Sequence, residues 1–164
     1  MKEIILNQDL TLYFSKNFPK RYKKKAFFKH QVVVGIGGNI GNVLGRFDAV
    51  FRYFKKDRRF HIVQTSPILK NPPFGYLEQA DFFNAVFVLQ TSMAPREMLK
   101  NLLHIEQLQK RERSFKNAPR SMDLDIIFFD DIRIKSAKLT IPHPKWSERI
   151  SVMIPLGYVI KERV

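Results

Sequence analysis

The sequence predicts an α+β domain of the ferredoxin-like βαββαβ type, with an extra C-terminal helix and short strands. Short runs of apolar, β-branched residues alternate with segments whose apolar residues recur at helical spacing. The segments follow one another as strand, helix, strand, strand, helix, strand, which is the split βαβ order. The length of 164 residues suits one domain with a sizeable core.

The first strand is expected at residues 32–36, an apolar run that ends in a Gly/Asn turn at 37–42. The apolar residues between Val43 and Phe54 recur at helical spacing and predict the first helix. Pro95 suits the first position of the second helix. The other predicted elements are strands at 60–68, 82–91 and 122–129, a helix at 95–109, extended pieces at 132–134 and 139–141, and a last helix at 145–156.

Residues 1–31 show no clean period and are interpreted as a basic, aromatic-containing N-terminal extension, partly ordered, before a domain at 32–164. The extension holds eight Lys or Arg and two Asp or Glu. Its mixture of basic and aromatic residues is compatible with RNA contact. An arm that packs on the surface of the domain is the favoured interpretation.

The composition limits the partners and the compartment. A formal charge of +14 suits an anionic partner such as nucleic acid, a membrane surface or a polyphosphate. The absence of cysteine excludes disulfides and cysteine-based zinc sites and fits a reducing compartment. No apolar run is long enough to span a membrane and no secretory signal is visible. We therefore expect a cytoplasmic, monomeric protein without a membrane or nucleic acid partner.

Asp123 and Asp125 give the strongest local signal for chemistry. In a strand, residues i and i+2 point to one face, so the two carboxylates would lie side by side, with Leu124 and Ile126 facing the core. Crowded carboxylates repel unless a cation compensates, and Mg²⁺ prefers one or two carboxylates together with phosphate oxygens and water. Alone, the pair is as compatible with solvated surface charge.

A basic loop immediately precedes this strand. Arg111, Arg113, Lys116 and Arg120 lie on it, and guanidinium groups match the geometry of phosphates. A flexible basic loop beside paired carboxylates favours a metal–polyphosphate site over a salt-bridged surface loop.

Phe82 and Asn84 share a parity in one strand, after the rigid loop 71–75. An aromatic ring beside a carboxamide suits a flat heterocycle, through stacking and paired hydrogen bonds. A core Phe with a backbone-satisfied Asn is an equally good interpretation of these two residues alone. The glycine-rich turn lacks the full dinucleotide pattern, no P-loop is present, and no serine, cysteine or histidine constellation indicates a covalent nucleophile.

Several of these segments occur together and in order in one family. They are Gly37–Asn39, Asn71–Gly75, Asp81–Ala85, Glu106, Arg111–Arg113, Pro119–Ile126 and Leu139–Pro144. Over about residues 32–157 the chain resembles 6-hydroxymethyl-7,8-dihydropterin pyrophosphokinase, a folate-synthesis enzyme with a ferredoxin-like fold. The resemblance implies transfer of pyrophosphate from ATP to the pterin hydroxymethyl group, which releases AMP.

The resemblance also implies roles for individual residues. Asp123 and Asp125 would hold two Mg²⁺ ions, and Arg111 and Arg120 would stabilise charge during the transfer. The implied pterin contacts are Gly37, Asn71, Pro72, Phe74, Phe82 and Asn84. The implied ATP contacts are Glu106, Arg113, Ile126, Lys138, Thr140, His143 and Arg149.

The sequence departs from the family pattern at a few positions. Asn117-Ala118 stands where Trp-Gly is frequent, and Ser151 replaces the aromatic residue expected to form a second wall for the pterin. Phe82 replaces a frequent Tyr and Lys138 a frequent Arg. Two alternatives stay open: a basic ferredoxin-like RNA-binding module, and a non-catalytic relative that binds nucleotide. The first lacks an aromatic RNA-binding strand motif, and the intact acidic and basic residues disfavour the second.

Overall fold

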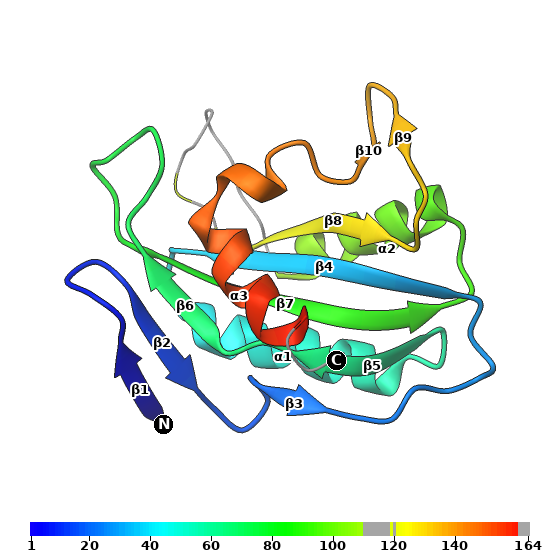
Figure 1. Ribbon diagram of the computed structural model, residues 1–164, viewed down its shortest axis with the longest axis horizontal. Coiled ribbons are helices and arrows are strands. Elements are labelled where there is room, and N and C mark those ends of the chain that lie inside the picture. Colours follow the sequence, from blue (N-terminus) through cyan, green and yellow to red (C-terminus); the bar gives the residue numbers. More distant parts are fainter. Residues whose placement is uncertain (110–118, 120, 161–164) are drawn as a thin grey trace.

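The chain folds into an antiparallel sheet with helices on both faces, as a computed structural model shows (Figure 1). The structure describes residues 1–109, 119 and 121–160. The predicted α+β class is confirmed. The helices are α1 (Val43–Lys56), α2 (Pro95–Leu108) and α3 (Ile150–Ile160), with a 3₁₀ turn at Trp146–Glu148.

The main sheet has eight strands and the neighbour order β1-β2-β6-β7-β4-β8, while β5 pairs with both β3 and β7. Every pairing is antiparallel. The strands are β1 (Lys2–Ile5), β2 (Thr11–Phe14), β3 (Lys20–Arg21), β4 (His30–Gly38), β5 (Phe60–Thr65), β6 (Ile68–Asn71), β7 (Phe82–Thr91) and β8 (Asp123–Phe129). A separate hairpin pairs β9 (Ile134–Lys135) with β10 (Thr140–Ile141).

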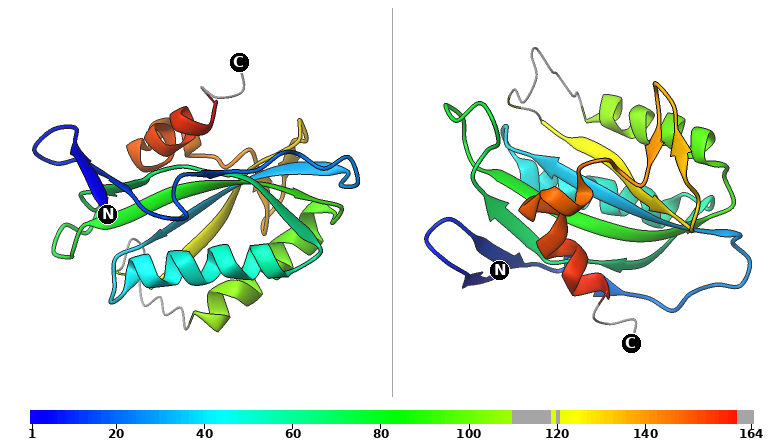
Figure 2. Two further views of the ribbon diagram at one scale, coloured as in Figure 1. Left: turned by 90° about the horizontal axis from the view of Figure 1, so that it is seen from below. Right: turned by 45° about the horizontal axis from the view of Figure 1, so that its top comes forward.

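The helices divide between the two faces of the sheet. Seen edge-on, α1 and α2 lie on one side and α3 lies on the other (Figure 2). The main core fills the α1/α2 side, where Phe47 and Phe54 are fully buried. A smaller cluster, which includes Val33, Ile127 and Leu156, lies under α3. Neighbouring strand residues point to opposite faces, which explains why two clusters use the same strands.

Local chemistry explains where α1 begins. Asn42 accepts a hydrogen bond from the Gly45 N–H at 3.0 Å and so caps the helix N-terminus. The buried side chains Val43, Phe47, Val50, Phe51 and Phe54 then form one apolar stripe toward the sheet.

Two predicted elements differ from the structure. The strand expected at 60–68 is two strands, β5 and β6, separated by Ser66 and Pro67. Proline has no N–H for a ladder bond, so the strand breaks there. Both halves still pair with β7.

The second difference is the N-terminal segment, which is an integral part of the sheet and not a partly ordered surface arm. β2 pairs with β6, and β3 pairs with β5. Phe18 is fully buried and packs edge-on against Phe87, with ring centroids 5.4 Å apart. The spacing of apolar residues does not reveal these strands, because only two residues of the segment, Leu12 and Phe18, are buried.

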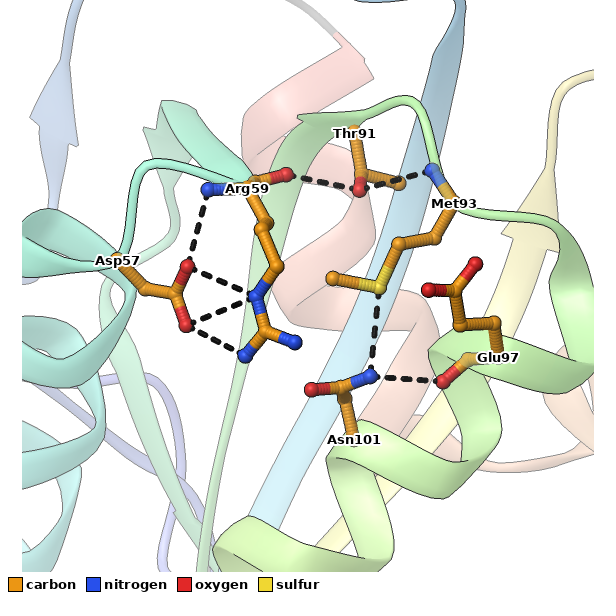
Figure 3. Close-up of polar contacts among 6 residues, drawn as sticks. All are labelled: Asp57, Arg59, Thr91, Met93, Glu97 and Asn101. Carbon is orange, nitrogen blue, oxygen red and sulfur yellow. Dashed lines mark hydrogen bonds and ion pairs between the residues drawn. The ribbon is translucent and has the colours of Figure 1, made fainter.

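A polar network fixes the end of the sheet where α1 meets β5 and β7 meets α2 (Figure 3). Asp57 accepts bonds from the Arg59 side chain through both carboxylate oxygens, at 3.0 and 2.7 Å. The Thr91 hydroxyl donates to the Arg59 carbonyl at 2.9 Å. This bond ties the start of β5 to the end of β7.

Candidate active site

Two glycines on β4 form the floor of the site. In the sheet register, Gly37 lies between Asn84 of β7 and Asp123 of β8. Gly35 lies two residues earlier, between Val86 and Asp125. A side chain on the central strand would fill the space between the amide and the carboxylates, so glycine leaves that space open.

The crowding at Gly37 is severe. A Cβ atom at this position would lie 2.4 Å from the Asn84 Oδ1 atom, which is shorter than any ordinary non-bonded contact. Gly35 is less restricted, since its Cβ would lie 3.3 Å from a terminal carbon of Ile127. Gly37 therefore sets how closely the Asn84 amide approaches the backbone of β4.

A cavity above this floor brings together residues from both predicted sites. Its lining includes Gly37, Phe74, Phe82, Asn84, Asp123, Asp125, His143, Arg149 and Ser151. Asp123 and Asp125 thus share one face of β8, as the strand period predicts, while Leu124 and Ile126 belong to the core on the other face. Phe82 and Asn84 share a face of β7 in the same way.

The Asn84 amide is held in position from behind. Its Nδ2 donates to Asn71 Oδ1 at 2.7 Å, and Asn71 Nδ2 donates to the Pro72 carbonyl at 2.9 Å. Asn71 is 2% exposed. Asn71 and Pro72 do not line the cavity, so their visible role is to orient Asn84.

A second cavity adjoins the first and shares Asp125 and His143 with it. Its lining includes Ile126, Lys138 and Thr140. These three residues and His143 are all predicted ATP contacts. The shared residues place the exposed Asp125 carboxylate at the boundary between the two cavities.

Glu106 borders neither of these two cavities in the described structure. It is 4% exposed, and its Oε1 accepts the Leu124 N–H at 2.8 Å. β8 ends the sheet order, so this N–H faces outward from the sheet and needs a partner. Glu106 therefore fixes the backbone between the two aspartates.

The surroundings of His143 favour its neutral form. Burial lowers the pKa of its imidazole below the ordinary value, Arg149 lowers it further and Asp125 opposes the shift. The Lys145 N–H donates to Nδ1 at 3.1 Å, so the proton of the neutral ring lies on Nε2. His143 can then donate one hydrogen bond where the cavities meet.

Asp123 and Asp125 suit a hard divalent cation. Among the residues that the structure describes, no group of three or more His, Asp and Glu side chains could hold a metal ion. Mg²⁺ does not need such a group, because one or two carboxylates together with substrate phosphates and water complete its coordination. The two aspartates that border one cavity therefore fit the predicted ion.

Phe74 and Arg149 meet at the mouth of the first cavity. The Arg149 guanidinium lies 5.9 Å from the centre of the Phe74 ring, within range of a cation–π contact. Phe74 remains 42% exposed. An apolar ring at the rim of a polar cavity can cover a ligand within it.

Some predictions lie outside this geometry, and sequence analysis missed one residue. The predicted contacts Arg111, Arg113 and Arg120 lie outside the described residues.

Sequence analysis did not predict Gly35 as a site residue. Its parity with Gly37 in an apolar strand was the available signal, because alternate glycines leave one face of a central strand bare.

The fold and the two cavities define a class: an α+β domain with adjoining small-molecule cavities, one of which contains paired carboxylates beside a carboxamide and an aromatic ring. A family model described as 7,8-dihydro-6-hydroxymethylpterin-pyrophosphokinase matches residues 33–161. The chain belongs to this family.

Similar proteins carry the corresponding name. The "2-amino-4-hydroxy-6-hydroxymethyldihydropteridine pyrophosphokinase" of Helicobacter pylori is 42% identical over 87% of this chain and 89% of the relative. The protein of that name from Campylobacter jejuni is 43% identical over 88% of this chain and 92% of the relative. A "Folate synthesis bifunctional protein, mitochondrial" of Arabidopsis thaliana is 35% identical over 78% of this chain but only 23% of its own length. The comparisons support neither alternative, the RNA-binding module or the non-catalytic relative.

Proposed function

We propose that this protein transfers pyrophosphate from ATP to the hydroxymethyl group of 6-hydroxymethyl-7,8-dihydropterin in folate biosynthesis. The products are the pterin diphosphate and AMP. The observation that carries the proposal is the single cavity shared by Asn84, Phe82, Asp123 and Asp125. Family membership supplies the reaction, and the cavity supplies groups for both substrates.

The pterin lies in the first cavity under this proposal. Phe82 stacks on the flat ring, and the Asn84 amide hydrogen-bonds to its edge, oriented by Asn71 and Pro72. Gly37 lets the ring lie close to the β4 backbone. Ser151 lines the cavity without offering a ring, so the Phe74 ring serves as the second wall.

ATP lies in the second cavity under this proposal. Lys138 supplies positive charge, while Thr140, His143 and the backbone near Ile126 offer hydrogen bonds. Glu106 acts here by holding the backbone at Leu124. Arg113 and Arg149 complete the predicted ATP contacts, and Arg149 would reach ATP from the first cavity, which it borders.

Asp123 and Asp125 bind two Mg²⁺ ions in this assignment. Bound Mg²⁺ neutralises and orients the phosphate oxygens of ATP. Asp125 borders both cavities and Asp123 borders the first, so phosphates held by this pair face the pterin. In the transfer, a bond forms between the hydroxymethyl oxygen and the β-phosphorus. The bond from the β-phosphorus to the AMP oxygen breaks, and the hydroxyl proton is released.

Arg111 and Arg120 stabilise the charge that develops on the phosphates during this step. Guanidinium groups suit this role because they remain charged and bind phosphate oxygens in pairs. Both residues come from the segment between α2 and β8, next to Asp123 in the sequence.

A product assay tests the reaction. The full chain, with Mg²⁺, ATP and the hydroxymethyl pterin, should release AMP and pterin diphosphate in equal amounts, and no AMP without the pterin. Release of ADP, or no turnover by a folded sample, would contradict the proposal. Substrates labelled at the β-phosphate show directly whether pyrophosphate moves as one unit.

Four further assignments belong with this proposal. The ferredoxin-like classification is supported by the strand order β6-β7-β4-β8 around α1 and α2. The division at residue 31 is proposed on function alone: every assigned site residue follows it, while β1, β2 and β3 belong to the same sheet as the rest of the chain. A cytoplasmic location and a monomeric state stay predictions. The described residues contain no helix long and apolar enough to cross a membrane, and sedimentation measures the oligomeric state.

A further inference from the structure

A third recess, separate from the two cavities described above, lies at the opposite end of the sheet. Phe82, at the start of β7, lines the first cavity. Thr91, at the end of β7, pairs with Phe60, and Phe60 lines the third recess. The ten residues of β7 span roughly 30 Å, so the first cavity and the third recess lie about that far apart. We call this site the basic hollow. It has a volume of about 570 Å³, within the range of small-molecule sites.

Cations line the basic hollow on two sides. Lys23 and Lys25 come from the segment after β3, and Lys55, Lys56 and Arg58 come from the end of α1. Like charges that face one another across a recess repel, so an anion between them would stabilise the arrangement.

The only carboxylate in the lining is already engaged. Among the described residues that line the hollow, Asp57 alone is acidic. Both its oxygens accept bonds from the Arg59 side chain, which is not part of the lining (Figure 3). The pKa of Asp57 lies below its ordinary value because of this pairing. The charge of Asp57 is therefore offset mainly by Arg59, and it does little to neutralise the five cations around the hollow.

The backbone that carries Lys23 and Lys25 is fixed in place. Gln90 Oε1 accepts the Lys25 N–H, and Gln90 Nε2 donates to the Lys25 carbonyl, both at 2.9 Å. His61 Nε2 donates to the Lys23 carbonyl at 2.7 Å. Because these bonds hold the backbone, only the exposed lysine side chains remain to be ordered when a ligand binds.

The floor and walls of the hollow are aromatic. Phe54 and Phe60 form part of the floor and are buried in the main core. Phe28 stacks on His61 with the two planes 7° apart, and the Lys55 ammonium lies 3.7 Å from the centre of the Tyr22 ring. Phe54 and Phe60 are 0% and 5% exposed, so the aromatic surface open to a ligand comes from the partly buried Tyr22 and Phe28. Such surface below a cationic rim suits a molecule that has both a flat group and phosphates.

A purely structural role explains only part of the cluster. Lys55 and Lys56 occupy the last turn of α1, where cations offset the helix dipole. This effect gives no reason for Lys23 and Lys25 to face them from another segment. We propose that the basic hollow binds a small anion with two or more adjacent phosphate groups, free or carried on a nucleoside.

The recessed shape favours this ligand over a polymer or a bilayer. The cations border one partly open recess, which matches a compact polyphosphate. A nucleic acid strand instead needs a track of charges that extends along a groove. A bilayer needs several apolar groups that project from the protein surface, whereas Phe27 is the one large, strongly exposed apolar side chain among the described residues 22–28 and 55–62.

Amide-resolved titration of the isotope-labelled full chain tests the inference. Inorganic tripolyphosphate should shift the amide signals of residues 22–28 and 55–62, separately from any shifts at residues 121–127. Exchanging one cation on each side, Lys23→Gln with Lys55→Gln, should weaken binding at the hollow by about tenfold. The control pair Lys2→Gln with Lys16→Gln removes the same charge outside the hollow and should bind as the native protein does.

The comparison ligands identify the occupant. Tighter binding of ATP than of tripolyphosphate at residues 22–28 indicates a nucleotide, while equal binding indicates that the phosphates alone are recognised. Amide shifts confined to the active site would contradict a binding site at the basic hollow. Equal weakening of tripolyphosphate binding by the Lys23/Lys55 pair and by the Lys2/Lys16 control pair would contradict it as well. Preferential binding of a short oligouridylate or of anionic vesicles at these residues would overturn the ligand class. AMP release should stay native in both variants, which separates this inference from the proposed reaction.

Discussion

At the residue scale, Asp123 and Asp125 carry the proposed chemistry. Asp123→Asn and Asp125→Asn each keep the shape of the side chain but remove a charge that binds the metal. We expect each to lower kcat for AMP release by roughly 10²- to 10³-fold, the effect of losing a main electrostatic stabiliser. Thermal stability should hold or rise, because the substitution relieves repulsion between two neighbouring carboxylates.

Asp131→Asn is the matched control for this pair. Asp131 is exposed and lies beyond the opposite end of β8. Its substitution should leave kcat unchanged. Native turnover in either Asp123→Asn or Asp125→Asn would remove the metal assignment.

Gly37 gives a steric prediction. In Gly37→Ala the new methyl group would lie 2.4 Å from Asn84 Oδ1, so the amide must move. We expect the Kd for the pterin to rise by about tenfold or more, on the basis of about 1–3 kcal/mol for overpacking. Fluorescence titration with the pterin measures the effect.

Gly157→Ala is the control for Gly37→Ala. Apart from its chain neighbours and the backbone of its own helix, nothing lies within 4 Å of the Cβ position at Gly157, which is inside α3. Alanine should there stabilise the helix by about 0.5–1 kcal/mol and leave pterin binding unchanged. Equal effects of the two substitutions on pterin binding would refute the close contact at Gly37.

At the element scale, the loop between β6 and β7 carries Phe74, the proposed second wall for the pterin. Phe74→Ala should raise the KM for the pterin by about fivefold while kcat changes little, because stacking contributes about 1 kcal/mol. Leu77→Ala alters the same loop, where Leu77 is 73% exposed and lines neither active-site cavity. Equal KM values for the two variants would show that the Phe74 ring does not contact the pterin.

The N-terminal strands make a prediction about stability. Phe18 is fully buried among Phe47, Phe51 and Phe87. Phe18→Ala should lower the free energy of unfolding by about 3–5 kcal/mol, the effect of a large cavity. Phe27, in the same N-terminal segment, is 80% exposed, and Phe27→Ala should change stability by less than about 0.5 kcal/mol. Urea titration measures the free energy of unfolding of both variants. A small effect of Phe18→Ala would contradict the integral position of the segment in the sheet and favour a surface arm.

The elements also show what sequence alone can predict. Parity in β7 and β8 correctly paired Phe82 with Asn84 and Asp123 with Asp125, because a strand period of two is a local property. The pairing of β2 with β6 joins Thr11 to Lys70 and has no local signal. The same holds for the Glu106 bond to Leu124, since it depends on where α2 packs against the edge of the sheet.

At the scale of the whole molecule, one ion pair makes stability depend on pH. The Arg59 side chain lowers the pKa of Asp57 in the folded protein. A depressed folded pKa contributes stability above the unfolded value near 3.8, and this contribution is lost as the pH falls through the folded pKa. The stability difference between the native protein and Asp57→Asn should therefore be present at pH 6–7 and disappear at acid pH.

Urea unfolding at a series of pH values measures this difference. The effect should be small, because Arg59 is about half exposed and solvent screens the pair. High salt at pH 7 should reduce it as well. A difference that stays constant down to pH 2 would show that the loss in Asp57→Asn does not come from the charge.

The bare floor at Gly35 and Gly37 has a consequence for inhibition. A compound that lies flat on this floor contacts main-chain atoms of β4 rather than side chains. Substitution at Gly37 cannot change those contacts without also displacing Asn84, the proposed contact of the pterin edge. Resistance to such a compound would therefore have to arise at the rim of the cavity, where Phe74 and Arg149 lie, and not at its base.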